Sequence, residues 1–397
     1  MSEIFLTIFF ISVLLFFLGS GIWVALSMIG VSAIGMMLFT SRPVGDAMAT
    51  TIWGTSSSWT LTALPLFVWM GEILFRTKLS ENLFKGLSPW LQKMPGGLIH
   101  VNVVGCALFA AISGSSAATV ATVGKMSIPE LRKRNYPEKI LLGSLAGSGT
   151  LGLLIPPSII LIIYGVAVQE SIAKLFIAGI IPGIMIALIF MSYVIIWSLI
   201  NKKEMPKILE EFSFLEKIRR SKQLLPVILL ITAVIGSIYT GIATATEAAS
   251  LGVVGALILS FFQKSLSLET FKSSLLGATK TSCMIAFILA GSTFLSLAMG
   301  FTGLPRNLAL WIQNMELSPY FLILVLMIFY IILGMFLDGI SAVVLTMAII
   351  EPMIRQAGFD MIWFGIFLVI VVEMAQITPP VGFNLFVLQG MANKDMG

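Results

Sequence analysis

The sequence is poor in charge and in residues that hold metals. Only 11% of its 397 residues are charged, and it contains a single histidine and two cysteines. Cys106 and Cys283 both lie inside apolar runs, where a cysteine is typically a buried small residue rather than half of a disulfide or a metal ligand. His100 alone leaves little scope for a metal centre or a histidine-based triad. The composition excludes an ordinary soluble domain.

Apolar residues dominate instead. They make up 58% of the chain, which is typical of a polytopic α-helical membrane protein. The first apolar run begins at Ile4, has no basic flank and continues directly into another span, so we do not expect a cleaved signal peptide. Residues 4–39 are too many for one span, and the glycines at positions 19 and 21 predict a break into two helices.

The basic residues lie in the loops between the apolar spans. The net charge of +5 is therefore better explained by membrane topology than by a nucleic-acid surface. Placing loops 76–100, 131–139, 201–223 and 263–280 on one side of the membrane collects 18 of the 24 Lys and Arg residues there. The positive-inside rule makes that side cytoplasmic.

Residues 113–119 are small and rich in hydroxyl groups, yet they lie between two apolar arms, 98–112 and 120–128. Each arm is about half the length needed to cross a bilayer. This pattern predicts a re-entrant hairpin whose polar tip is enclosed by protein or by a water-filled cavity. We expect Pro129 to end the hairpin. The alternative is a stripe of small residues for helix packing, which is common in membrane proteins.

A second copy of the pattern favours the hairpin. Pro156-Pro157 interrupts the next apolar span 27 residues after Pro129, and Pro379-Pro380 follows Pro352 at the same spacing. At the resulting offset of 223 residues, Ser115 falls on Asp338. Internal symmetry with Gly/Pro-interrupted apolar segments in both halves is a pointer to the binding site of a secondary transporter.

The charge distribution gives the two copies opposite orientations, because the first hairpin then enters from the cytoplasm and the second from outside. The predicted fold is an all-α polytopic membrane protein with inverted-topology repeats. Each repeat contains a re-entrant helical hairpin and a discontinuous transmembrane helix. Two inverted halves allow one fixed site to open to either face of the membrane.

The double prolines predict a binding site for ions. Consecutive prolines remove backbone donors and push the preceding residue out of the α region. Carbonyls freed at such a break, together with Ser and Thr hydroxyls, suit Na⁺, while the half-helix that restarts directs its positive dipole end at an anion. The alternative is a plain proline kink, which the repetition makes the weaker interpretation.

Three acidic residues lie in or beside apolar sequence. Asp338 lies at the predicted tip of the second hairpin, and intramembrane acids are usually functional. With Ser341 and the carbonyl of Gly334 it is suited to hold a cation or to bind a polar substrate, and it is also a good N-cap. Glu373 and Glu247 are each open to ion or proton binding and to a structural hydrogen bond. No nucleotide, haem or hydrolase motif is present, so we expect no organic cofactor.

Segments 105–118, 125–131, 147–158, 246–250, 334–341 and 376–386 together resemble the large membrane subunit of TRAP (tripartite ATP-independent periplasmic) transporters, the DctM-like family. The resemblance implies an Na⁺-coupled, elevator-type symporter in the bacterial inner membrane. Its substrate would be a carboxylate-containing organic anion, such as a C4-dicarboxylate, sialic acid or a similar sugar acid. A periplasmic substrate-binding protein would deliver the substrate, and a small four-helix membrane subunit, separate or fused, would complete the transporter. The family usually has a further C-terminal helix, which is missing from this sequence, so truncation of the chain and a true departure from the family both remain open.

The resemblance also implies a division of the chain. Residues 1–97 would form N-terminal scaffold helices, and residues 98–168 the first half of the transport domain. Residues 169–319 would add scaffold helices with the cytoplasmic connector 201–223, and residues 320–397 the second half of the transport domain. Sodium would be bound by Ser113, Gly114, Ser115, Ser116, Gly149, Thr150, Gly334, Asp338, Thr378, Pro379 and Val381.

The substrate is implied to lie between the hairpin tips. The residues expected there are Ser115, Ser116, Thr119, Pro156, Ser158, Asp338, Ser341, Asn384 and Arg306. For Arg306, the residues themselves favour an interfacial cation. Two other functions remain open: a stand-alone Na⁺/dicarboxylate symporter without a binding protein, and, remotely, an intramembrane enzyme that uses Asp338 and Glu373. An intramembrane enzyme would give no reason for an inverted repeat, and we do not expect the protein to be an enzyme.

Overall fold

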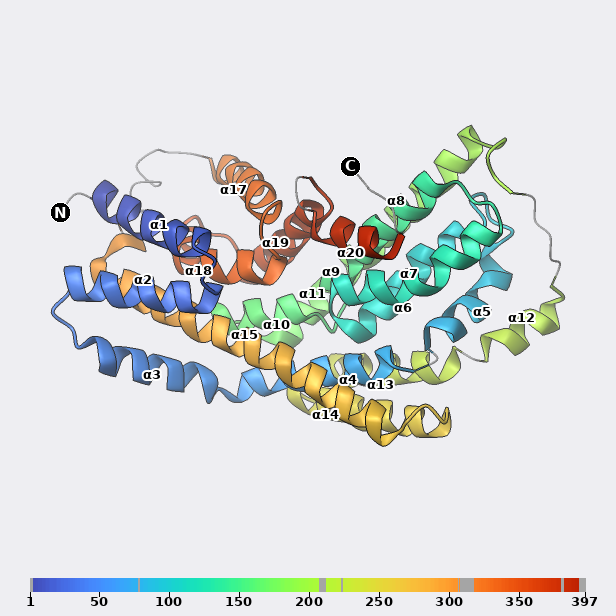
Figure 1. Cartoon of the computed structure of the whole chain (residues 1–397), viewed down its shortest axis with the longest axis horizontal. Coiled ribbons are helices and arrows are strands. Elements are labelled where there is room, and N and C mark those ends of the chain that lie inside the picture. Colours follow the sequence, from blue (N-terminus) through green and yellow to red (C-terminus); the bar gives the residue numbers. More distant parts are fainter. Residues whose placement is uncertain are drawn as a thin grey trace.

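The structure is a computed structural model that describes residues 3–77, 79–206, 212–222, 224–305, 307, 318–379 and 382–392. Every regular element among these residues is a helix (Figure 1). Four of the described helices are long and apolar enough to cross a membrane, and bent helix pairs raise this number to as many as seven. The four are α11 (Ile172–Ile200), α14 (Ala245–Phe262), α15 (Leu268–Thr302) and α18 (Gly339–Gln356). The prediction of a polytopic helical membrane protein is confirmed.

The N-terminal part begins with the two helices that the sequence predicts. Helix α1 (Glu3–Gly19) is separated from α2 (Val24–Phe39) by a turn in which Gly21 has a φ of +77°. The more polar segment after α2 is also helical. It forms α3 (Val44–Ser56), none of whose residues is buried. A short 3₁₀ turn, η1 (Trp59–Thr62), leads into α4 (Ala63–Phe75) at an angle of 52° to α3, and α5 (Leu79–Leu91) follows.

The middle of the chain differs from the sequence prediction at two of the expected loops, and part of the loop 201–223 is helical over Phe214–Ser221. We expected a basic loop from residue 263 to 280, but α15 already begins at Leu268 and runs for 35 residues. Ser267 caps it, since its side chain accepts a hydrogen bond from the N–H of Thr270 at 3.0 Å. An N-cap with Glu269 in the first turn is favourable for starting a helix there. Lys272 therefore belongs to a long helix and not to a loop.

Two copies of one helical unit are separated by this middle part. The first repeat contains α6 (Ile99–Ser113), α7 (Ser116–Lys133), α8 (Glu138–Gly149), α9 (Leu151–Leu154) and α10 (Ile159–Ala167). The second repeat contains α17 (Pro319–Gly334), α18, α19 (Met361–Gln376) and α20 (Phe383–Ala392). A shift of 223 residues superposes the bounds of α7 on those of α18. Each unit is a pair of helices followed by an interrupted helix, as the double prolines predict.

One detail of the repeat was predicted wrongly. Pro129 does not end its helix but lies inside α7, which continues to Lys133, and its counterpart Pro352 likewise lies inside α18, which continues to Gln356. A proline removes only one intrahelical hydrogen bond. The turn that follows each proline carries basic residues, Arg132 and Arg355 among them, and these are favourable at a helix C-terminus.

Helices α11, α12 (Phe214–Ser221), α13 (Leu225–Tyr239), α14 and α15 connect the repeats. Helix α15 packs against α2, α3 and α4 on one side of the molecule and against α18 of the second repeat. In Figure 1 the α7–α8 turn, α12 and the α14–α15 connection lie toward the right-hand end, whereas the α2–α3 connection lies at the left. The basic loops thus gather at one end of the long axis.

Candidate functional site

The first tip, residues 113–116, joins α6 to α7. Helix α6 ends at Ser113, Gly114 adopts the left-handed conformation with a φ of +60°, and Ser115 is extended and caps α7. A Cβ added at Gly114 would lie 2.7 Å from the carbonyl oxygen of Pro157, so both the turn and the close approach require glycine. Thr119 folds over the tip, because its Oγ1 donates to the Ser115 carbonyl at 2.7 Å and lies 2.8 Å from the Ser113 Oγ.

The tip contacts the first break, residues 155–158, between α9 and α10. The N–H of Ile159 donates to the carbonyl of Gly114 at 3.2 Å. Gly152 lies against the tip, since a Cβ placed there would be 2.5 Å from the Ser115 carbonyl oxygen. The helix bends by 40° across the break. The tip of the hairpin and the interrupted helix of the first repeat therefore form one structural unit.

The break leaves backbone carbonyls to be satisfied in another way. In a continuous helix, the N–H groups of residues 156 and 157 would bond the carbonyls of Gly152 and Leu153, but both residues are prolines. The buried Ser158 hydroxyl donates to the Leu153 carbonyl in their place. The same oxygen caps α10 by accepting from the N–H of Leu161 at 3.3 Å. Among the described residues, no side-chain hydroxyl donates to the Gly152 carbonyl in this way.

Two other residues predicted for sodium lie one turn earlier. Gly149 is the last residue of α8 and packs against the side chain of Val120 on α7. Thr150 is buried, and its Oγ1 donates to the Gly147 carbonyl at 2.7 Å. Both residues belong to the interrupted helix that the first tip contacts.

The second tip, residues 335–338, is the counterpart of the first. Asp338 is half-buried and caps α18, because its Oδ2 accepts from the N–H of Ser341 at 3.2 Å, which confirms the predicted N-cap. Gly334 ends α17 and packs against Ala375, whose Cβ would be 2.6 Å from an added Cβ. After the end of α19, the Thr378 Oγ1 donates to the Met374 carbonyl at 2.7 Å.

The two repeats meet at Gln376, the last residue of α19. The Ser116 hydroxyl donates to the Gln376 Oε1 at 2.8 Å, and both side chains are buried, each only 3% exposed. On its other side Gln376 touches the second tip, since a Cβ added at Gly339 would lie 2.9 Å from the Gln376 Nε2. Gly339 also approaches Ile160 of the first repeat. Sequence reasoning did not select Gln376, although a polar residue three positions before a double-proline break is a usable signal.

Several predicted residues do not join this arrangement. Asn384, in the first turn of α20, is buried, and neither polar atom of its side chain has a hydrogen-bond partner among the described residues. Pro379 is exposed. Val381 and Arg306 lie outside the residues that the structure describes. For the buried Glu373, no partner is found for Oε1 in the described part of the chain.

Glu247 has a structural role. It forms a capping box with Thr244, whose N–H and hydroxyl both donate to the Glu247 Oε2 at 2.8 Å. The N–H of Glu247 in turn donates to the Thr244 Oγ1 at 3.3 Å. Of the two interpretations that the sequence left open for Glu247, the structural hydrogen bond is therefore the one observed.

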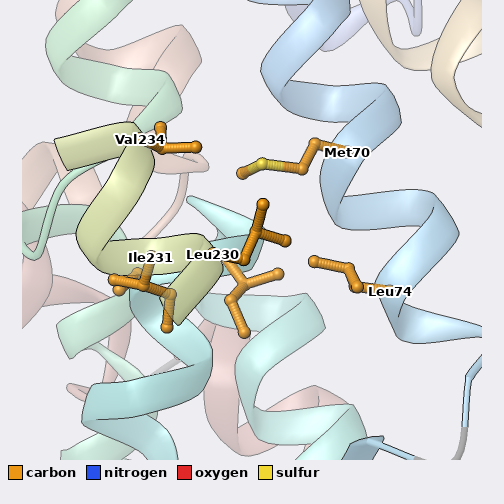
Figure 2. Close-up of a pocket in the computed structure, with 7 residues that line it drawn as sticks. Met70, Leu74, Leu230, Ile231 and Val234 are labelled. Carbon is orange, nitrogen blue, oxygen red and sulfur yellow. The ribbon is translucent and has the colours of Figure 1, made fainter. Parts of the chain in front are cut away.

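An apolar crevice lies beside the first tip. It is bounded by α4, α6 and α13, and in Figure 2 Met70 and Leu74 face Leu230, Ile231 and Val234 across it. Its lining has no polar side chain and therefore offers no donor to an anion. Close to it, Gly71 of α4 packs on the end of α6, where an added Cβ would be 3.2 Å from the Ile112 carbonyl oxygen.

The chemistry around the tips is that of neutral oxygen ligands and helix ends. Serine and threonine hydroxyls and backbone carbonyls dominate, and Asp338 is the one acidic residue in the two tips. Helices α7, α10 and α18 all begin at this region with side-chain caps. Oxygen ligands bind small hard cations, and helix N-termini favour anions. The arrangement can therefore hold a cation and an anion close together.

Comparison with known proteins points to one family. Residues 9–397 match the family described as "Tripartite ATP-independent periplasmic transporter, DctM component". The chain is 34% identical over 366 residues to a C4-dicarboxylate TRAP transporter large permease protein of Pseudomonas aeruginosa, covering 92% of this chain and 85% of that protein. It is 31% identical over 381 residues to the isethionate TRAP transporter permease protein DctMQ of Oleidesulfovibrio alaskensis, covering 95% and 59%. It is 31% identical over 353 residues to a 2,3-diketo-L-gulonate TRAP transporter large permease protein of Escherichia coli, covering 87% and 81%.

Proposed function

Because this chain belongs to the DctM component family of tripartite ATP-independent periplasmic (TRAP) transporters, we propose that it moves its organic anion together with Na⁺. Membership makes it a multi-pass transport permease of the bacterial inner membrane and not an enzyme. The observation that carries the proposal is the meeting of two repeated tips and two interrupted helices around Gln376.

Sodium binds to oxygen ligands in each repeat under this proposal. In the first repeat the ligands are carbonyls and hydroxyls of Ser113, Gly114, Ser115 and Ser116, with Gly149 and Thr150 of the interrupted helix. In the second repeat they are Gly334, Asp338, Thr378, Pro379 and Val381. Pro156 offers no N–H to the Gly152 carbonyl, which lies beside this ligand set, and this supports a cation nearby because unwound carbonyls in a membrane need a partner. Unwound carbonyls are the Na⁺ ligands that discontinuous helices typically supply.

The substrate binds between the tips, where the N-terminal ends of α7, α10 and α18 offer positive dipole ends to a negative group. The residues proposed to contact it are Ser115, Ser116, Thr119, Pro156, Ser158, Asp338, Ser341, Asn384 and Arg306. The amide of Asn384 has no hydrogen-bond partner among the residues that the structure describes, which supports a polar ligand nearby. The relatives' names include two carboxylates and one sulfonate, isethionate, so a compact oxyanion group is what these substrates share. We propose a carboxylate-containing anion, such as a C4-dicarboxylate or a sugar acid.

Transport follows an elevator motion in which residues 98–168 and 320–397 move as the transport domain. Residues 1–97 and 169–319 form the scaffold, and the charged connector 201–223 is cytoplasmic. Two inverted repeats give the two end states of such a motion. The gathering of the basic loops at one end of the molecule supports the orientation, since positive loops are retained in the cytoplasm (Figure 1).

The working transporter contains two further proteins. A periplasmic binding protein delivers the anion, and a small four-helix subunit, separate or fused, completes the membrane part. Uptake by the reconstituted chain with and without its binding protein tests this. Strict dependence on the binding protein is the expected result, and full uptake without it would favour a stand-alone symporter. A thermal-shift screen of the binding protein against organic acids identifies the substrate.

Substitution of Asp338 tests the sodium site. Asn caps helices about as well as Asp, so Asp338→Asn removes the charge while keeping the cap of α18. We expect Asp338→Asn, and Ser115→Trp at the equivalent position of the first repeat, to abolish Na⁺-driven uptake while membrane insertion is retained. Uptake assays in proteoliposomes under a Na⁺ or K⁺ gradient measure the effect. Unchanged uptake and Na⁺ dependence in both variants would refute the site assignment.

A further inference from the structure

The hydrogen bond between Ser116 and Gln376 joins two buried side chains from different repeats. The repeats also touch close by, where Gly339 approaches Ile160, and at a distance, where the Tyr164 hydroxyl donates to the Met361 carbonyl at 2.6 Å. Met361 and Gln376 are at opposite ends of α19, about 22 Å apart at the rise of an α-helix. The Ser116–Gln376 bond is thus a polar contact at the tips within a wider interface of the repeats, in which α7 also packs on α20 and α10 on α18 and α19.

Gln376 has a different contact at each end of its amide group. Its Oε1 accepts from Ser116 at the start of α7, and its Nε2 lies against Gly339 at the start of α18. Any side chain at Gly339 would collide with this amide and with Val372. A single side chain thus bridges the two tips, and the glycine is what allows the second contact.

Each end of the bridge is next to residues that we propose as sodium ligands. Ser116 is itself one of the proposed ligands, Gly339 directly follows Asp338, and Gln376 precedes Thr378 by two residues. A cation that fixes the first tip also fixes the direction of the Ser116 hydroxyl, and thereby the Gln376 amide against the second tip. The converse holds for a cation at the second tip, because coupling between two sites is reciprocal.

We propose that Gln376 is a positioning residue that couples the two sodium sites, so that sodium at one tip raises the affinity of the other. The inference rests on the proposed Na⁺-coupled function. A buried hydrogen bond of this kind, made fully only when both tips are ordered, corresponds to an affinity change of about 2- to 13-fold. The hydrogen bond has two discrete states, made and broken. Coupling between two sites requires such a two-state feature, whose equilibrium both sites influence.

Equilibrium binding of ²²Na⁺ to the purified full chain, with any subunit that co-purifies, tests the coupling. The variants are Ser116→Ala, Gln376→Leu, the double variant, and Gln376→Asn, which keeps an amide but is one methylene too short to reach Ser116. Thr122→Ala is the matched control, because Thr122 is a buried hydroxyl on the same helix with no partner among the described residues. If Gln376→Leu does not fold, Gln376→Asn gives the same comparison.

The wild type and Thr122→Ala are expected to bind Na⁺ with a Hill coefficient above one. Both single variants should lower the Hill coefficient toward one and raise the half-saturating Na⁺ concentration by about 2- to 13-fold, with the double variant no worse than either. A wild-type Hill coefficient of one, wild-type binding by Gln376→Leu, or multiplying effects in the double variant would overturn the coupling and leave Na⁺ binding intact. A wild type that binds no Na⁺ would instead overturn the proposed function, and the coupling with it.

Discussion

The substitution Gly152→Ala tests whether the contact between the first tip and the interrupted helix is needed for Na⁺ binding. It adds one methyl group at that contact and leaves the stability of the helices themselves largely unchanged. In the structure a Cβ at this position lies 2.5 Å from the Ser115 carbonyl oxygen and 2.7 Å from the Thr119 Oγ1. Ordinary contacts begin at 3.4 Å, so the tip must retreat by about 0.9 Å to accept alanine. The nearest atom belongs to the backbone, which cannot rotate away as a flexible side chain would.

The retreat acts directly on the proposed sodium ligands. Overpacking of this kind costs about 1–3 kcal/mol. If the cost falls on the docked tip that binds the cation, Na⁺ affinity decreases by about 5- to 150-fold, since 1.4 kcal/mol is a factor of ten. The rest of α8 and α9 is not disturbed, so insertion and helix content should be retained.

Gly143→Ala is the matched control for Gly152→Ala. Gly143 lies in α8, and no atom lies within 4 Å of an added Cβ there. Alanine at this position should be neutral or slightly stabilising. Both variants are compared by ²²Na⁺ binding and by the increase in Tm on replacing KCl with NaCl. Wild-type Na⁺ affinity in Gly152→Ala would refute the contact between tip and break as part of the site.

Two further substitutions test other contacts. Ser158→Ala leaves the buried Leu153 carbonyl without its donor, so we expect a loss of about 1–3 kcal/mol, seen as a lower Tm in detergent and in KCl; an unchanged Tm would contradict the role given to this hydroxyl. Gly71→Leu places a side chain against the Ile112 carbonyl, where the proposed scaffold meets the transport domain, so we expect slower uptake with Na⁺ binding retained; normal uptake would argue against movement along this contact.

The interruptions of the fold were predictable from the sequence because prolines and glycines act locally. The break after Leu154, the end of α19 before Pro379 and the cap at Asp338 all follow from which backbone groups those residues can supply. The length of α15 was not predictable from its lysines, because charge alone does not distinguish a loop from a helix that extends beyond the bilayer. Pro129 was wrongly expected to end its helix. It lies inside α7 because the loss of one intrahelical hydrogen bond does not prevent the last turn, with its basic residues, from continuing the helix.

The presence of polar residues at the tips was predictable from the sequence, but their pairings were not. The tips and the double prolines marked Ser115, Asp338 and Ser158, since polar groups stand out in apolar sequence. The partnership of Ser116 with Gln376 joins positions 260 residues apart and depends on how the repeats pack. The same is true of Gly152 and Gly339, whose need to be glycine comes from neighbours brought close only by the fold.

A cryo-electron-microscopy map of the transporter in NaCl, compared with one in KCl, tests the central claim most directly. We predict sodium density at both tips, coordinated by oxygens of residues 113–116 with Thr150 in one repeat and by Asp338 with Thr378 in the other. Both features should be absent in KCl. Well-ordered tips with the same empty ligand positions in both salts would contradict the account.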